Sequence, residues 1–137
     1  MTLVVDTGVL LAALDSADAE HAVCAQLLRV RERLVAPEPV LPELDYWCAA
    51  KRLSSDFDRI LRDVQRGAIE IEHVLAEDVE RILELRSRYR DLRVGYVDAA
   101  VLAIVERLGE RKLATLDRRH FGVMRPRHVA ALELLPG

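Results

Sequence analysis

Short apolar runs alternate with longer segments of helical periodicity along this chain. The runs at residues 3–5, 34–36 and 113–116 stop at polar or proline residues, which is typical of strands buried on both faces. Residues 68–73 alternate isoleucine with glutamate, which predicts a half-exposed strand at the edge of a sheet. Residues 131–135 predict one further strand, so about five short strands are expected.

Between these runs, apolar residues recur every three or four positions, as they do on the buried face of a helix. Thr7 is the predicted cap of the first helix, and Pro42 suits the first residue of another because its missing N–H costs nothing there. Val79, Ile82 and Leu83 mark the apolar face of a later helix. The predicted helices cover residues 9–14, 19–33, 42–53, from Ser54 or Ser55 to Gly67, 79–89 and 97–108.

This order of elements defines the expected architecture. Strands that alternate with helices imply a parallel sheet with helices packed on both faces. At 137 residues and 15.5 kDa, the chain has the size of one domain with a buried core. We therefore predict a single domain over residues 1–137, built as a three-layer α/β/α sandwich around a mainly parallel sheet of about five strands.

Composition narrows the possible functions only a little. A hydrophobic content of 51% and a charged content of 31% fit a folded protein, and the net charge of −3 does not indicate a nucleic-acid binder. Aromatic residues are scarce at 4%, which makes an aromatic platform for bases a poor first guess. Cys24 and Cys48 have no metal-type spacing and are expected as buried thiols. No apolar segment has the length of a membrane span, so the cytoplasm is the default expectation.

Four acidic residues lie at the boundaries of the predicted elements. Asp6 and Asp117 each follow a predicted strand, and Glu43 and Asp98 each lie in the first turn of a predicted helix. Ligands of open α/β sheets bind outside the carboxyl ends of the strands, where the strand order reverses. We therefore expect these four carboxylates to converge at that edge.

Each acid also has an ordinary structural explanation, as a helix cap, a partner of the helix dipole or the start of a turn. Together they repel, because two unit charges about 4 Å apart interact by roughly 4 kcal/mol at an effective dielectric of 20. Such a cluster must protonate, separate or hold a cation. Oxygen ligands without paired histidines favour Mg²⁺ or Mn²⁺ over Zn²⁺, and the four histidines share no ligand spacing.

A magnesium ion held by a few carboxylates usually meets phosphate oxygens, so the predicted chemistry is metal-assisted hydrolysis of a phosphodiester. Arg118 and Arg119 come directly after Asp117 and are candidates for gripping a polyanion such as RNA. The same stretch also has a plain interpretation as a solvated turn.

Four short motifs resemble those of the PIN-domain nucleases, and specifically the VapC toxins of bacterial toxin–antitoxin pairs. They are VVDT at residues 4–7, VLPEL at 40–44, VGYVDAA at 94–100 and LDRRHF at 116–121, the last preceded by Thr115. Each motif is weak alone, but their order over nearly the whole chain is specific. A further acid that some relatives carry near the third motif has no clear counterpart here.

The resemblance implies a PIN-like fold and a Mg²⁺-dependent endoribonuclease that cuts structured RNA, either tRNA or a ribosomal RNA loop. Asp6 and Asp98 would be direct metal ligands, Glu43 a base or a ligand through water, and Asp117 a ligand of a second ion or of a water. Thr7 and Thr115 would orient the carboxylates. The resemblance further implies a homodimer that is silenced by a cognate VapB antitoxin.

Two other classes of protein fit the chain less well. A phosphatase of the Asp-nucleophile type needs a second aspartate two residues after the first, where this chain has Gly8. A receiver domain needs paired acids at the first strand and a late lysine, whereas Asp6 stands alone and Lys112 begins its strand. A non-catalytic PIN-like module has no need for four clustered acids.

Overall fold

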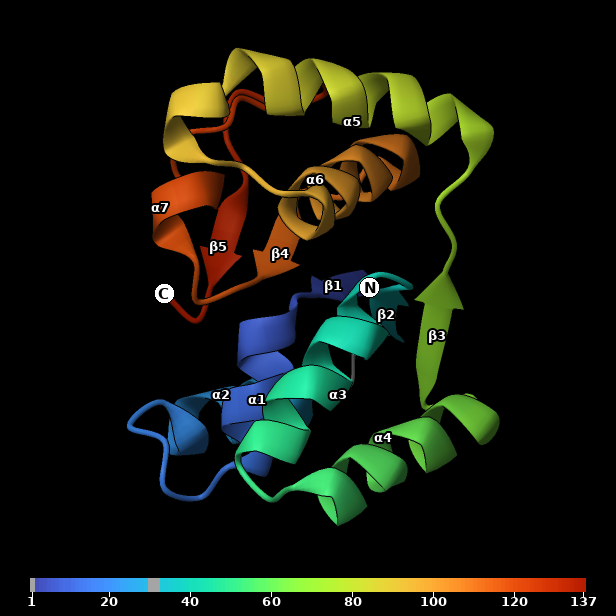
Figure 1. Ribbon diagram of the computed structural model, residues 1–137, viewed down its shortest axis with the longest axis vertical. Helices are drawn as coiled ribbons and strands as arrows, with labels where there is room; N and C mark the ends of the chain where they lie inside the picture. Colours follow the sequence, from blue (N-terminus) through green and yellow to red (C-terminus); the bar gives the residue numbers. More distant parts are fainter. Residues whose placement is uncertain (1, 30–32) are drawn as a thin grey trace.

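A five-stranded, all-parallel sheet runs through the middle of the computed structural model, which describes residues 2–29 and 33–137 (Figure 1). The strand order is β3-β2-β1-β4-β5, so β1 lies at the centre and β3 at an edge, as its alternating sequence predicted. Val4 of β1 pairs with Val35 on one side and Leu113 on the other. The strands are β1 (Thr2–Val5), β2 (Arg33–Pro37), β3 (Ile69–Glu72), β4 (Lys112–Ala114) and β5 (Glu133–Leu135).

Helices cover both faces of the sheet, which confirms the predicted three-layer sandwich. In Figure 1, α1 to α4 lie below the sheet, α5 and α6 lie above it, and the short α7 lies at the left beside β5. None of the helices in the described part of the chain is long and apolar enough to cross a membrane. The helices are α1 (Thr7–Leu14), α2 (His21–Arg29), α3 (Val40–Ala50), α4 (Ser54–Gln65), α5 (Ala76–Arg88), α6 (Tyr96–Leu108) and α7 (Arg118–Phe121), with a short 3₁₀ helix η1 (Arg90–Leu92).

The core forms between the central strands and α6. Leu3, Val4 and Val5 are fully buried, as expected for a strand covered on both faces. Helix α6 is buried on nearly all sides from Ala99 to Val105, because α5 packs over the face that the sheet does not cover. Its alanines allow this close approach. Cys24 and Cys48 are buried free thiols, as predicted.

Helix α5 packs differently from the sequence expectation. Val79 and Leu83, which marked its predicted apolar face, are 44% and 59% exposed. The buried face instead carries Asp78 and Arg81 beside Ile82. The apolar spacing therefore predicted that a helix is present but not which side of it is buried. Neighbouring residues point about 100° apart around a helix, so an error of one residue in the predicted face exposes the residues that were expected to be buried.

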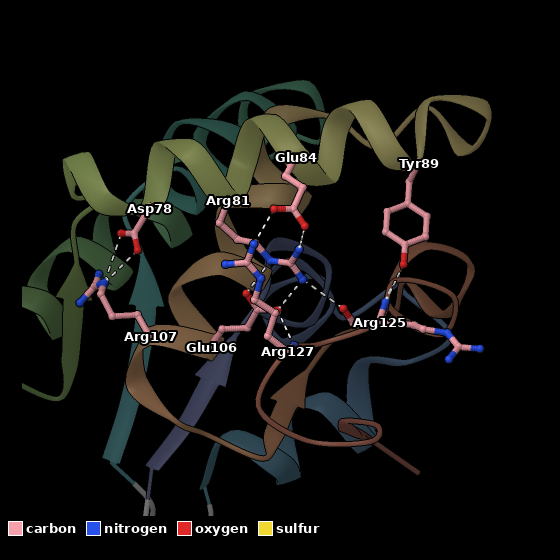
Figure 2. A network of polar contacts seen from close by, with 8 residues as sticks. All are labelled: Asp78, Arg81, Glu84, Tyr89, Glu106, Arg107, Arg125 and Arg127. Atoms are coloured by element: carbon pink, nitrogen blue, oxygen red, sulfur yellow. Dashed lines mark hydrogen bonds and ion pairs between the residues drawn. The ribbon is translucent and has the colours of Figure 1, made fainter.

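Ion pairs satisfy the buried charges of α5 (Figure 2). Arg81 donates from Nε to Oε1 of Glu106 on α6 at 2.8 Å, and Arg107 donates from Nε to Oδ1 of Asp78 at 3.0 Å. Arg127, from the segment before β5, pairs with Glu84 and donates its backbone N–H to Glu106. Polar contacts therefore join α5, α6 and the C-terminal segment.

Several predicted boundaries were wrong. The third helix begins at Val40, two residues before Pro42. The N–H groups of the whole first turn have no partner within the helix, so proline is tolerated at its third residue as well as at its first. Leu53, and neither serine, occupies the N-cap of α4. The strand predicted at 113–116 ends at Ala114. The helix predicted over 19–33 is seen as His21–Arg29, Arg33 begins β2, and residues 30–32 lie outside the described residues.

Candidate active site

The four acidic residues singled out in the sequence line one cleft at the carboxyl edge of the sheet. Asp6, Glu43, Asp98 and Asp117 contribute to its wall, and its volume is about 430 Å³. The cleft lies where the strand order reverses, because β1 is followed in sequence by its neighbour on one side, β2, and paired on the other side with β4. Its remaining lining consists of Thr7, Gly8, Leu11, Trp47 and Leu116.

Asp6 joins the cleft to the core of the sheet. Its backbone N–H donates to the carbonyl oxygen of Ala114 at 2.9 Å, which continues the pairing of β1 with β4. Its side chain caps α1 by accepting from the N–H of Thr7 at 2.8 Å. The prediction that Thr7 is the cap was therefore wrong, because the carboxylate one residue earlier already fills that role.

Thr115 fixes two of the acids relative to one another. Its Oγ1 donates to Oδ2 of Asp6 at 2.8 Å and accepts from the backbone N–H of Asp117 at 3.0 Å. The threonine is fully buried, so water does not compete for these bonds. A single hydroxyl thus orients the carboxylate that ends β1 and the residue that begins α7.

Burial makes the ionised form of Asp6 costly. The side chain is 5% exposed, and desolvation raises the pKa of Asp6 to about 7, although hydrogen bonds from Thr115 and Thr7 oppose the shift. The nearby charges of Asp98 and Glu43 raise this pKa further. The pKa of Asp98 is also raised, first by burial and then by the charge of Asp117. The cleft therefore holds more negative charge than the protein neutralises.

His120 partly offsets this charge. Its Nδ1 lies 2.7 Å from Oδ2 of Asp98 and 2.9 Å from Oδ2 of Asp117, and its Nε2 lies 2.9 Å from the carbonyl oxygen of Leu92. A carbonyl oxygen only accepts, so Nε2 carries a proton, and a second proton on Nδ1 satisfies both carboxylates. Burial lowers the pKa of His120, but the bond to Leu92 and the two carboxylates outweigh it, and the pKa is raised.

The donor set of the cleft fits a hard divalent cation. Carboxylate oxygens of Asp98 and Asp117 lie within 4.8 Å of one another and of a ring nitrogen of His120, and a cation bound by these oxygens would take the place of the proton that the ring supplies. The hydroxyl of Thr7, which lines the cleft beside Asp6, is buried and has no hydrogen-bond partner among the described residues. An unpartnered oxygen beside unbalanced carboxylates is what a hydrated cation would satisfy.

Two residues of the site were not predicted from the sequence. His120 was set aside because the histidines share no ligand spacing, yet its neighbour three residues earlier, Asp117, was a candidate that could have drawn attention to it. Trp47 lies one helical turn after Glu43, is 46% exposed and lines the cleft. The low aromatic content had argued against an aromatic contact for bases, but the position i+4 to a candidate acid was a usable signal.

The two arginines predicted to bind RNA lie beside the cleft but do not line it. Arg118 and Arg119 belong to α7, a short helix where the sequence had suggested a turn. Both arginines are exposed, and the guanidinium of Arg118 donates to the carbonyl oxygens of Leu134 and Pro136.

The chain is similar to known proteins over most of its length. The family model described as PIN domain matches residues 3–125. Ribonuclease VapC26 of Mycobacterium tuberculosis (strain ATCC 25618 / H37Rv) is 35% identical over 126 residues, which are 90% of this chain and 93% of that protein.

Solved structures share the fold. The sarcin–ricin loop cleaving toxin VapC20 of Mycobacterium tuberculosis is 20% identical with a TM-score of 0.77, over 85% of this chain and 90% of that chain. VapBC2 from Rickettsia felis, bound to a DNA fragment from its promoter, is 18% identical with a TM-score of 0.69, over 98% of this chain and 97% of that chain.

Proposed function

Because the chain belongs to the PIN-domain family and is similar to a VapC ribonuclease, we propose that it is a Mg²⁺-dependent endoribonuclease and the toxin of a toxin–antitoxin pair. The observation that carries this proposal is the cleft where Asp6, Glu43, Asp98 and Asp117 meet. The raised pKa values of Asp6 and Asp98 support it. Burial and mutual repulsion make their ionised forms costly, and a bound cation would offset that cost.

Mg²⁺ would be held by Asp6 and Asp98, with Glu43 and Asp117 as further ligands directly or through water, and Mn²⁺ suits the same oxygens. When bound, such an ion polarises a phosphoryl oxygen and lowers the pKa of a water molecule. Glu43 is half-buried in the first turn of α3, and its proposed role is to accept a proton from the attacking water. Thr115 keeps Asp6 oriented toward the cleft.

The proposed substrate is a folded RNA, either tRNA or ribosomal RNA, cut where its nucleotides are unpaired. The related toxin VapC20 is described as cleaving the sarcin–ricin loop, which is ribosomal RNA. Trp47 supports an unpaired site, because an exposed indole in the cleft offers a face on which a base can stack. Arg119, exposed on α7, is available for a phosphate oxygen, and Arg118 lies next to it.

A VapB-type antitoxin is the proposed protein partner, since solved relatives include toxin–antitoxin complexes from Rickettsia felis and Klebsiella pneumoniae. A basic segment of such a partner would find the acidic cleft complementary. We also propose a homodimer, which sedimentation of the isolated chain tests directly; a monomer at micromolar concentration would contradict it.

The catalytic proposal is tested with Asp6→Asn and Asp98→Asn, which keep the shape of the side chains and remove their charge. Loss of a metal ligand that stabilises the transition state by several kcal/mol should lower the rate of RNA cleavage by a factor on the order of 10² to 10³. Asp45→Asn, an exposed acid on the same helix as Glu43, is the matched control. Cleavage of total RNA and growth arrest on expression that persist in both cleft variants would refute the proposal.

A further inference from the structure

A groove lined by arginines lies beside the acidic cleft, between the end of α5 and the start of α6. Arg86, Arg90 and Arg93 line it together with Leu83, Val94 and Gly95, and its volume is about 560 Å³. We propose that this arginine groove binds the phosphate backbone of the RNA whose scissile phosphate occupies the cleft. This inference rests on the proposed ribonuclease function and names the surface that holds the substrate.

The first observation is that the arginines of the groove have no acidic partners. Within residues 2–29 and 33–137, none of Arg86, Arg90 and Arg93 forms an ion pair, and all three are exposed. Six arginines outside the groove are engaged with carboxylates: Arg33 with Glu70, Arg59 with Asp56, Arg66 with Asp63, Arg81 with Glu106, Arg107 with Asp78, and Arg127 with Glu84. The groove therefore keeps its positive charge available for a ligand.

The second observation is a local reversal of charge. Residues 86–93 contain four arginines and one aspartate, a sum of +3 (4 − 1), whereas the whole chain carries −3. Among the residues that the structure describes, no acidic side chain lines the groove. A concentrated positive patch on an acidic protein attracts a polyanion to one place, and guanidinium groups bind phosphate oxygens through two parallel hydrogen bonds.

The third observation is the proximity of the groove to the candidate active site. Gly95 lines the groove and caps α6, and Asp98 of the cleft follows within one helical turn, a rise of about 5 Å. Leu92, between Arg90 and Arg93, accepts a hydrogen bond from His120, and the same ring contacts Asp98 and Asp117. An RNA strand that leaves the cleft toward the start of α6 would therefore reach the three arginines.

The position of the groove favours RNA over an acidic protein segment. The four carboxylates of the cleft repel the phosphates on either side of the scissile one. The bound RNA strand therefore needs a positively charged surface next to the cleft. The described lining of the groove has no acid, and its three charges come from the end of α5 and from η1 with its C-cap, which suits successive phosphates better than a single carboxylate.

The test compares a groove variant with a control variant of equal charge. The groove variant is Arg86→Gln, Arg90→Gln and Arg93→Gln, and the control is Arg29→Gln, Arg52→Gln and Arg62→Gln. The control arginines are exposed, lie on α2, after α3 and on α4, and have no ion pair among the described residues. Arg52 and Arg93 both have a left-handed backbone, with φ of 60° and 55°, so the strain is matched too.

Binding of a fluorescein-labelled, unstructured oligouridylate is measured by anisotropy in EDTA at several salt concentrations, so that no cleavage occurs. The groove variant should bind at least about tenfold more weakly, and the slope of log affinity against log salt should fall by about 2, because each lost phosphate contact on a single strand contributes about 0.7. The control variant should keep both values near those of the unchanged protein. Circular dichroism melts of both variants check that the fold is intact.

Equal RNA affinity and equal salt slopes in the two variants would overturn the groove as an RNA surface. The proposal is equally overturned if the groove variant binds RNA normally and changes only the sedimentation of the isolated chain or the capture of an antitoxin. The catalytic test has a separate outcome. If Asp6→Asn still cleaves RNA while the groove variant binds it weakly, the proposed metal centre fails and the groove stands. If Asp6→Asn is inactive and the groove variant binds normally, the groove alone fails.

Discussion

At the scale of single residues, Asp6 serves both the fold and the site. Its carboxylate caps α1 and accepts a hydrogen bond from Thr115, and both contacts fix its orientation. Burial, however, raises the free energy of the ionised form that a metal ligand requires. His120 has a complementary position, since it brings a proton donor to Asp98 and Asp117 at the exposed side of the cleft. The site is therefore a compromise between the orientation of its carboxylates and their mutual repulsion.

This compromise predicts how stability depends on pH. The pKa of Asp6 is about 7 in the folded chain and ordinarily 3.8, so between these limits the folded state keeps a proton that the unfolded state releases. The free energy of unfolding of the metal-free protein should fall as pH rises from 4 to 7, with a contribution from Asp6 of up to about 4 kcal/mol. Asp6→Asn should flatten this dependence.

Urea unfolding in EDTA at pH 5 and pH 8 measures the effect, with Asp45→Asn as the control. Asp98 and His120, whose pKa values are also raised, retain their own contribution in the same direction. The assignment is wrong if Asp6→Asn loses as much stability between these pH values as the unchanged chain.

At the scale of elements, α5 is held by charge where the sequence suggested apolar contact. Arg81 is 7% exposed and Glu106 9% exposed, and they pair through two hydrogen bonds at 2.8 Å. Burying such a pair gains little net free energy, but removing one partner leaves a charge without compensation. Because α5 leads directly into η1 and α6, this packing also sets the position of the arginine groove and of Asp98.

Two arginine substitutions compare the contribution of this buried ion pair to stability with that of an exposed ion pair. Arg81→Ala should lower the free energy of unfolding by about 3–5 kcal/mol, since Glu106 is left buried without its partner. Arg59→Ala, which removes an exposed pair with Asp56 on α4, should cost no more than about 1 kcal/mol. Urea titrations give both values, and similar losses in the two variants would show that the α5 pair is not effectively buried.

At the scale of the whole molecule, the sheet order brings together acids that are far apart in the chain. Asp6 follows β1 and Asp117 follows β4, and these strands are neighbours although more than a hundred residues separate them. The helices that carry Glu43 and Asp98 in their first turns start from the same edge. A cation bound there would link both layers of helices through the sheet.

Binding of Mg²⁺ should therefore stabilise the whole fold. At a hundredfold excess over the dissociation constant, the gain is about 2.7 kcal/mol, which raises the Tm of a chain of this size by roughly 5–10 °C. The shift should be larger at pH 8 than at pH 6, because Asp6 must release its proton to bind the ion. Calorimetry checks both statements. Asp98→Asn should abolish the shift, and an undiminished shift in that variant would place the ion elsewhere.

The sequence by itself determined the five strands, the six longer helices, their order and the parallel sheet between two layers of helices. These features follow from local periodicity, because the spacing of apolar residues reports directly which residues need burial. The positions of the four acids at element boundaries were equally readable, and the edge rule for parallel sheets led to the expectation that they meet. Their catalytic roles remain predictions.

Only the tertiary structure decided which groups face one another. His120 reaches Asp98 across 22 residues, Arg81 reaches Glu106 across 25, and Arg86, Arg90 and Arg93 gather in one groove without acidic partners among the described residues. A pattern of polar residues does not identify its own partners, since pairing depends on the path of the chain between them. Local chemistry thus set the fold, and long-range packing set the electrostatics of the site.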